Sequence, residues 1–253
     1  MTSGLEALSA GAGPRAIVLS DLHLLQRESP RNDAFLRLIE SPVASSAQAL
    51  WLLGDIYDLF IGPYKFWGRT HARMLKALER LAERGTSVLW IEGNHDFHIA
   101  KLLASVGVEG VDADVTRDFG GRKVFLSHGD RVNSNDEAYL RWRAFTRGGL
   151  FRATMRAVPD ALAERFLVPL GEKLSHDSRG RDRYDPSLRA LYADYARKKF
   201  TEGYDAVFLG HCHLEENLNE GGKLYFNLGS WVQGPYRYGL YDAATNRVEV
   251  ITF

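Results

Sequence analysis

The sequence predicts an α/β protein in which strands alternate with helices. Short apolar runs rich in Val, Leu and Ile recur along the chain, and segments of helical periodicity lie between the first of them. Strand, helix, strand, helix, strand is the pattern of a layered α/β sheet. Towards the C-terminus the apolar runs follow one another without helices between them, which predicts hairpins at a sheet edge or in a second sheet.

The individual elements follow from these runs. Buried strands are expected over 16–20, 49–53, 87–91, 123–127 and 206–209, and later strands over 224–227, 238–241 and 247–252. Helices are expected over 31–40 and 69–84, the second ended by Gly85. Residues 1–14 lack the basic start and apolar core of a signal peptide, which predicts a flexible tail before a single domain over 15–253.

The composition limits the classes to which this protein can belong. The net charge is zero over 253 residues, which gives no indication of a nucleic-acid partner. No apolar stretch reaches the length of a transmembrane helix, and the single cysteine, Cys212, is compatible with a reducing cytoplasm. Residues 131–200 are helix-like and carry 15 Lys or Arg against 9 Asp or Glu. We interpret this segment as an inserted helical lid; the alternative is an ordinary solvated helical face.

Polar clusters stand at the C-terminal ends of five predicted strands. They are Asp21-Leu22-His23, Gly54-Asp55, Gly93-Asn94-His95-Asp96, His128-Gly129-Asp130 and Gly210-His211-Cys212-His213. Ligands bind at the carboxyl ends of strands in open α/β sheets, so we expect these clusters to meet in space. One such cluster alone is often a cap or a turn. Five in a row favour a functional site.

The residue types in these clusters predict a metal centre. Carboxylate, imidazole and amide oxygen suit divalent ions of intermediate hardness, such as manganese, iron or zinc. The candidate ligands are Asp21, His23, Asp55, Asn94, His128, His211 and His213. These are too many for one ion, whereas two ions that share a carboxylate fit the count. In extended backbone, residues two apart point to the same side, so each Asp-x-His or His-x-His pair is expected to reach one site. Neighbouring glycines let the backbone approach the ligands closely.

The order of the clusters resembles that of the calcineurin-like metallophosphoesterases, over roughly residues 16 to 240. The resemblance implies a four-layer sandwich of two mixed β-sheets flanked by helices, with the lid as an insertion. It also implies two divalent ions, Mn²⁺ in the first place and Fe or Zn as alternatives. One ion would be held by Asp21, His23, Asp55 and His213, and the other by Asp55, Asn94, His128 and His211. His95 would act catalytically without binding metal, and Asp96 would orient it.

A narrower resemblance is to the UDP-2,3-diacylglucosamine hydrolases of lipid A synthesis. It is carried by His128-Gly129-Asp130, Asp136, Tyr139, Trp142-Arg143, Leu174-Ser175, Ser178-Arg179 and Asn227-Leu228-Gly229-Ser230-Trp231. It implies cleavage of a lipid-nucleotide pyrophosphate to UMP and 2,3-diacylglucosamine 1-phosphate, in the cytoplasm and with peripheral contact to the inner membrane. The implied substrate contacts are Asn94, His95, Asp130, Asp136, Tyr139, Arg143, Ser175 and Arg179. Two positions differ, because this chain has His95 where the subgroup usually has Arg, and Asn133 where it often has Cys.

Two alternatives stay open at this point. The first is another cytosolic metallophosphodiesterase or a nucleotide phosphatase, with a lid of different purpose. The second is a binding protein on the same fold, which is disfavoured because no ligand position is missing from the sequence. The sequence does not indicate an oligomeric state.

Overall fold

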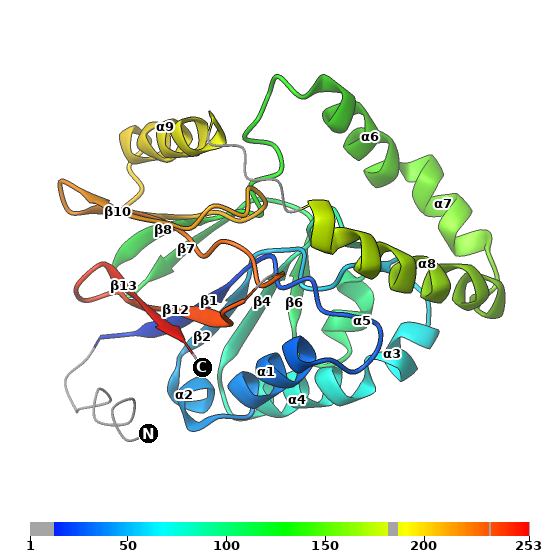
Figure 1. The fold of residues 1–253 in the computed structure, drawn as a ribbon. Helices are drawn as coiled ribbons and strands as arrows, with labels where there is room; N and C mark the ends of the chain where they lie inside the picture. The colour runs from blue at the N-terminus through cyan, green and yellow to red at the C-terminus, as the bar shows by residue number, and fades with distance from the viewer. Residues whose placement is uncertain (1–12, 182–186, 233, 253) are drawn as a thin grey trace.

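Two β-sheets pack face to face, and helices cover the outer face of each (Figure 1). The computed structural model describes residues 13–181, 187–232 and 234–252, and of residues 174–181 only the helical backbone. Aromatic rings join the sheets, since Trp51 in one sheet lies 5.4 Å from Phe208 in the other, centroid to centroid. The layers are those of the predicted α/β sandwich, so the predicted fold class is confirmed.

The first sheet contains the parallel strands that the sequence predicted. Its strand order is β13-β12-β1-β2-β4-β6, with β1 (Arg15–Leu19), β2 (Ala49–Leu52), β4 (Ser87–Ile91), β6 (Glu109–Val111), β12 (Arg237–Asp242) and β13 (Arg247–Thr252). The last two form an antiparallel hairpin at one edge, as expected. The central strands β1 and β2 are buried on both sides, because helices cover one face and the second sheet covers the other.

From residue 13 onwards, five helices precede the second sheet along the chain. They are α1 (Pro30–Ile39), α2 (Pro42–Ser46), α3 (Phe66–Thr70), α4 (Ala72–Glu83) and α5 (Ala100–Ala104). The side chain of Ser29 caps α1, and Pro30 occupies its first turn. The prediction of a single helix over 69–84 is wrong at its start, because the backbone of His71 is not helical and separates α3 from α4. The buried imidazole packs against Tyr57 and stacks on Trp67, so tertiary packing overrides the local periodicity.

The second sheet lies on the other side of the core. Its strand order is β10-β11-β9-β8-β7, with β7 (Val115–Phe119), β8 (Arg122–Leu126), β9 (Ala206–Phe208), β10 (Glu216–Glu220) and β11 (Lys223–Asn227). Helix α9 (Ser187–Thr201) covers its outer face and buries Tyr192, Ala193 and Ala196 there. A separate short ladder pairs β3 (Phe60–Ile61) with β5 (Asp96–Phe97) beside the predicted metal ligands.

Three helices form an arm that extends from the sandwich, which we call the lid arm. It consists of α6 (Glu137–Arg147), α7 (Gly149–Ala157) and α8 (Asp160–Arg181), and Figure 1 shows it on the side away from both chain ends. The helices of segment 131–200 thus divide between the lid arm and α9. Of the predicted tail, residues 1–12 lie outside the described residues. No helix in the described part of the chain is both long and apolar enough to cross a bilayer.

Candidate metal centre

The polar clusters that follow the strands meet at one end of the sandwich. Their ligand atoms form three overlapping groups, each with all atoms within 4.8 Å: Asp21, His23 and His213; His23, Asp55 and His95; and Asp55, His128 and His211. Asn94 belongs to the same site, since its Oδ1 lies 3.0 Å from Nε2 of His128. The structure therefore brings together all seven predicted ligands, and His23 and Asp55 each belong to two of the groups.

Two of the histidines are held with one ring nitrogen facing the cluster. Nδ1 of His23 is 3.0 Å from a carboxylate oxygen of Asp58, and Nδ1 of His128 is 2.8 Å from the carbonyl oxygen of Leu53. Both partners are acceptors, so in the neutral imidazole each Nδ1 carries the proton and each Nε2 keeps a free lone pair. Such outer contacts fix ring orientation in metal sites and raise the basicity of the ligand.

These lone pairs face the oxygen atoms of other acceptors. Their distances show whether the site suits a cation. Nε2 of His128 lies 3.0 Å from Oδ1 of Asn94 and 3.6 Å from Oδ2 of Asp55. Without a proton or cation among them, these electron-rich atoms repel one another in a buried site. Nitrogen and oxygen donors of this kind suit divalent transition metals. The donor set therefore fits a divalent cation.

Five of the predicted ligands adopt a backbone conformation that side-chain-bearing residues avoid. The φ angles are 52° at Asp21, 49° at His23, 52° at Asp55, 69° at His211 and 56° at His213. Each costs of order 1–3 kcal/mol and persists only where surrounding contacts enforce it, as at functional sites. The expectation of extended backbone at the two paired motifs is therefore wrong. Asp21 and His23 nevertheless reach one ligand group, as expected, whereas His211 and His213 join different groups.

Asp96 does not contact the His95 ring in the described hydrogen bonds, which corrects the predicted orienting role. Its carboxylate instead accepts from the backbone amides of Asp55, Ile56 and Gly93 and from the Trp90 indole, at 2.7–3.1 Å. Nδ1 of His95 lies 2.8 Å from the carbonyl oxygen of Asp58. Asp96 thus fixes the two loops that carry Asp55 and Asn94.

The electrostatics of the cluster show strong coupling between acids and imidazoles. Burial raises the pKa of Asp55, but the imidazoles of His128 and His95 outweigh it and hold the pKa below its ordinary value. Burial lowers the pKa of His128, yet the carboxylates of Asp55 and Asp130 outweigh it and raise the pKa. Burial and the neighbouring His128 lower the pKa of His211 to about 4. At neutral pH, therefore, Asp55 is ionised and His211 is neutral, as metal binding requires.

Metal affinity is expected to fall as the pH is lowered from mildly alkaline to mildly acidic values. A proton competes with the metal for Nε2 of His128, and the raised pKa of this imidazole moves the competition to higher pH than for an ordinary histidine. Titration of Mn²⁺ binding at several pH values measures the effect. The variant Asp130→Asn lacks one of the carboxylates that raise this pKa. In this variant the loss of metal affinity should occur at lower pH. An affinity independent of pH over this range would contradict the prediction.

Beside the ligands lies a second polar cluster made of predicted substrate contacts. The Asp130 carboxylate accepts from the Tyr139 hydroxyl at 2.7 Å and from Nε of Arg143, which ties α6 to the loop after β8. The Tyr139 ring lies 5.7 Å from the His211 ring, centroid to centroid. Asp136 caps α6 by accepting from the Tyr139 amide. The side chains of the remaining two predicted contacts, Ser175 and Arg179, lie outside the described residues.

Arg147 is a residue of this site that sequence reasoning missed. Its guanidinium donates to the carbonyl oxygen of Gly93 at 2.6 Å, beside the ligand Asn94, and lies 4.1 Å above the Phe97 ring. Nε of Arg147 is also 3.3 Å from the Asp112 carboxylate. The signal was its spacing, because residues four apart on a helix share a face and Arg143 precedes it by four.

The fold and site are those of a metal-dependent phosphohydrolase, and the chain belongs to the calcineurin-like phosphoesterase family, whose model matches residues 14–215. Among similar curated proteins is the UDP-2,3-diacylglucosamine hydrolase of Pseudomonas fluorescens, 32% identical over 227 residues, or 85% of this chain and 86% of that protein. The enzyme of the same name from Salmonella arizonae is 26% identical over 94% of this chain and 98% of its own length.

A solved structure shares the fold. An archaeal phosphodiesterase superposes with a TM-score of 0.50 at 15% identity, over 94% of this chain and 99% of that one. At this identity the likeness concerns the fold alone.

Proposed function

We propose that the protein hydrolyses the pyrophosphate of UDP-2,3-diacylglucosamine to UMP and 2,3-diacylglucosamine 1-phosphate. The observation that carries this is the apolar surface of the lid arm. In the described part of the chain, the large hydrophobic side chains that are exposed all lie on it: Trp142, Phe145, Leu150, Leu162, Phe166 and Leu170. Exposed apolar side chains concentrated on one arm favour a binding surface for an apolar ligand or membrane, and α6 of this arm also reaches the site through Tyr139 and Arg143. The names of the similar curated proteins support the same substrate.

The proposed centre holds two divalent ions, Mn²⁺ in the first place. Asp21, His23, Asp55 and His213 would hold one ion, and Asp55, Asn94, His128 and His211 the other. Asp21, His23 and His213 form one ligand group, Asp55, His128 and His211 form another, and Asp55 also groups with His23. Bound there, the ions supply Lewis acidity towards phosphoryl oxygens. Asp55 is the shared ligand in this arrangement, and the Asp96 carboxylate fixes its backbone amide at 3.0 Å.

The polypeptide itself supplies orientation and a proton. His95 is fixed through Nδ1 by the carbonyl oxygen of Asp58 and places its ring beside Asp55 and His23. Nε2 of the imidazolium form would then carry the proton for the leaving oxygen of the substrate. Tyr139 and Arg143, joined through Asp130, stand at the mouth of the centre as contacts for the anionic part of the substrate.

The lid arm also provides the proposed contact with the membrane. Its exposed apolar side chains stand among exposed arginines such as Arg141 and Arg165, and this combination suits the surface of an anionic leaflet. We therefore place the enzyme in the cytoplasm, with peripheral contact to the inner membrane where the lipid substrate resides.

The direct test is turnover of UDP-2,3-diacylglucosamine with Mn²⁺, measured as release of UMP, with and without a chelator. Release that depends on the metal is the expected result. Hydrolysis of bis(p-nitrophenyl) phosphate without any release of UMP would instead identify a phosphodiesterase of other specificity. If neither compound is hydrolysed in a metal-dependent way, the result would instead identify a binding protein on this fold.

Replacement of His95 by Ala is expected to leave metal content unchanged and to lower turnover by about 10²–10⁴-fold, the usual contribution of general acid catalysis. Metal analysis and steady-state kinetics on the same preparation measure both quantities. Loss of metal from His95→Ala would show instead that His95 is a ligand, since its ring belongs to one of the ligand groups.

A further inference from the structure

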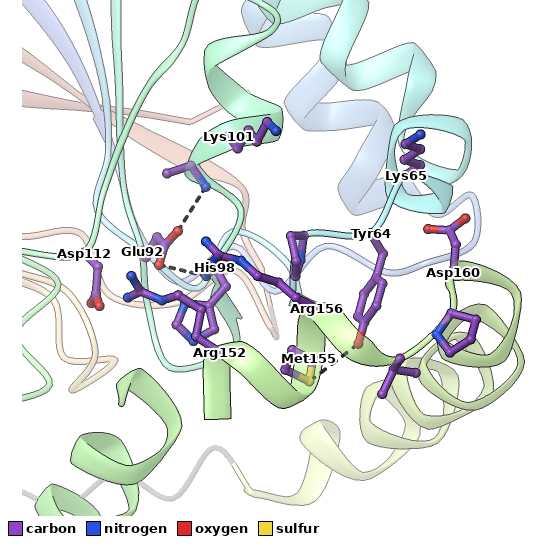
Figure 2. Close-up of a pocket in the computed structure, with 14 residues that line it drawn as sticks. Tyr64, Lys65, Glu92, His98, Lys101, Asp112, Arg152, Met155, Arg156 and Asp160 are labelled. Atoms are coloured by element: carbon purple, nitrogen blue, oxygen red, sulfur yellow. Dashed lines mark hydrogen bonds between the residues drawn. The ribbon is translucent and has the colours of Figure 1, made fainter. Parts of the chain in front are cut away.

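A large cavity lies between the lid arm and the sandwich, beside the metal centre. It measures about 870 Å³, and its walls come from α7, from α5, from the chain around the start of α3, and from the loop that follows β4 (Figure 2). None of the seven predicted metal ligands is among its lining residues. Glu92 and His98 line it on either side of the segment that carries Asn94. The cavity is thus a neighbour of the metal centre and not a part of it.

Four cationic side chains line this cavity without a partner of their own. They are Lys65, Lys101, Arg152 and Arg156. Within residues 13–181, 187–232 and 234–252, no hydrogen bond or ion pair joins any of the four to another group. Arg152 and Arg156 are four residues apart on α7, and Figure 2 shows both extending from that helix towards Glu92 and His98. Two guanidinium groups therefore face the same space.

The acidic groups of the lining do not neutralise these cations. Glu92 accepts hydrogen bonds from the backbone amides of residues 98–100 and lies 3.7 Å from the guanidinium of Arg147. Asp160 lies 3.6 Å from the guanidinium of Arg69. Asp112 pairs with Arg143 at 3.1 Å, and Asp160 accepts from a backbone amide in α3 at 3.2 Å. Each carboxylate is thus already paired with a donor outside the set of four. The cavity keeps an excess of unpaired positive charge.

We propose that this cavity binds the phosphate group of an anionic ligand, with Arg152 and Arg156 as the main contacts. Guanidinium groups bind phosphate through paired hydrogen bonds, and Lys65 and Lys101 add positive charge at the rim. The volume lies in the range of pockets that hold whole small molecules, so it accommodates more than a bare ion. The half-buried Met155 and the buried Tyr64, joined at 3.6 Å, form an apolar wall for the rest of the ligand. The proposal does not depend on the substrate of the metal centre.

The first arm of the test uses inorganic phosphate as the probe. Calorimetric titration of the Mn²⁺-loaded protein is expected to show two classes of site, one at the metals and one in the cavity. In the double variant Arg152→Gln/Arg156→Gln the second class should weaken by at least about ten-fold, because charge-assisted hydrogen bonds to phosphate are lost. Both side chains are exposed and unpaired in the described structure, so this variant should fold normally.

The second arm asks whether the phosphate belongs to a lipid. Vesicles of phosphatidylcholine with and without phosphatidylglycerol are sedimented with the wild-type protein and with both variants. The matched control is Arg37→Gln/Lys76→Gln, which removes the same charge from exposed positions on α1 and α4, outside both the lid arm and the cavity. Loss confined to the cavity variant supports the proposal. If the cavity variant loses binding only to vesicles, the phosphate group belongs to a lipid headgroup. If it loses binding only to free phosphate, the ligand is a soluble compound.

The proposal is overturned if the cavity variant binds both probes as the wild type does, or if the control loses binding equally. Release of UMP from UDP-2,3-diacylglucosamine is measured separately on the same proteins. A wild type that fails to release UMP but binds phosphate through Arg152 and Arg156 would refute the proposed function and leave the cavity assignment intact.

Discussion

Replacement of Asp55 by Ala is expected to remove both metal-binding groups at once and to lower turnover at least about a thousand-fold. Asp55 belongs to two of the three ligand groups, with His23 in one and with His128 and His211 in the other, and its Oδ1 also accepts from the amide of His95 at 2.8 Å. Loss of this carboxylate therefore removes a ligand and reduces the negative charge that the surrounding histidines face. Lewis-acid stabilisation amounts to several kcal/mol, and each 1.36 kcal/mol corresponds to about ten-fold in rate.

Metal analysis and hydrolysis of bis(p-nitrophenyl) phosphate measure this effect, and circular dichroism checks that the variant is folded. Asp194→Ala is the matched control, because Asp194 is exposed and pairs only with Arg197 on its own helix among the described residues. The control should keep its metal and its activity. An Asp55→Ala protein with full metal content and full activity would refute the shared-ligand role.

Replacement of Gly93 by Ala should disrupt the centre without changing any ligand. A Cβ atom at position 93 would stand 2.2 Å from Oδ1 of Asp55 and 2.4 Å from its backbone nitrogen. The backbone nitrogen cannot move freely, since it donates to the Asp96 carboxylate. Overpacking of this kind costs about 1–3 kcal/mol, and here the strain falls on the shared ligand. We expect loss of metal and of nearly all activity, together with a lower melting temperature.

The control for Gly93→Ala is Gly149→Ala. A Cβ atom at position 149 would meet nothing within 4 Å, and the residue begins α7 with no positive φ. This variant should be as stable as the wild type or slightly more so, because alanine restricts the unfolded chain. Equal metal content in the two alanine variants would contradict the close approach of the Gly93 and Asp55 loops.

Much of the fold and the identity of the ligands could be predicted from the sequence. The strands observed as β1, β2, β4, β8 and β9 agree with the predicted runs to within a residue or two, because a strand buried on both faces needs a continuous apolar run. The candidate ligands meet because the chain places polar residues directly after these strands. Residue type and spacing are local properties, and the sequence displays them directly.

The orientation of those residues was decided by the tertiary structure. The left-handed backbone at Asp21 and His23 depends on hydrogen bonds from Asp21 to the carbonyl oxygen of Gly54 and from His23 to that of Asp55. Asp96 supports two distant loops where local proximity suggested a contact with His95.

The break at His71 and the contact of Arg147 with the metal-binding loop have the same origin. Each depends on partners that lie far away in the sequence and become neighbours only when the layers pack. The sequence by itself thus determined which groups are present and near which strand ends they stand. Only packing between distant segments decided where each side chain points, because that direction depends on contacts that no local pattern encodes.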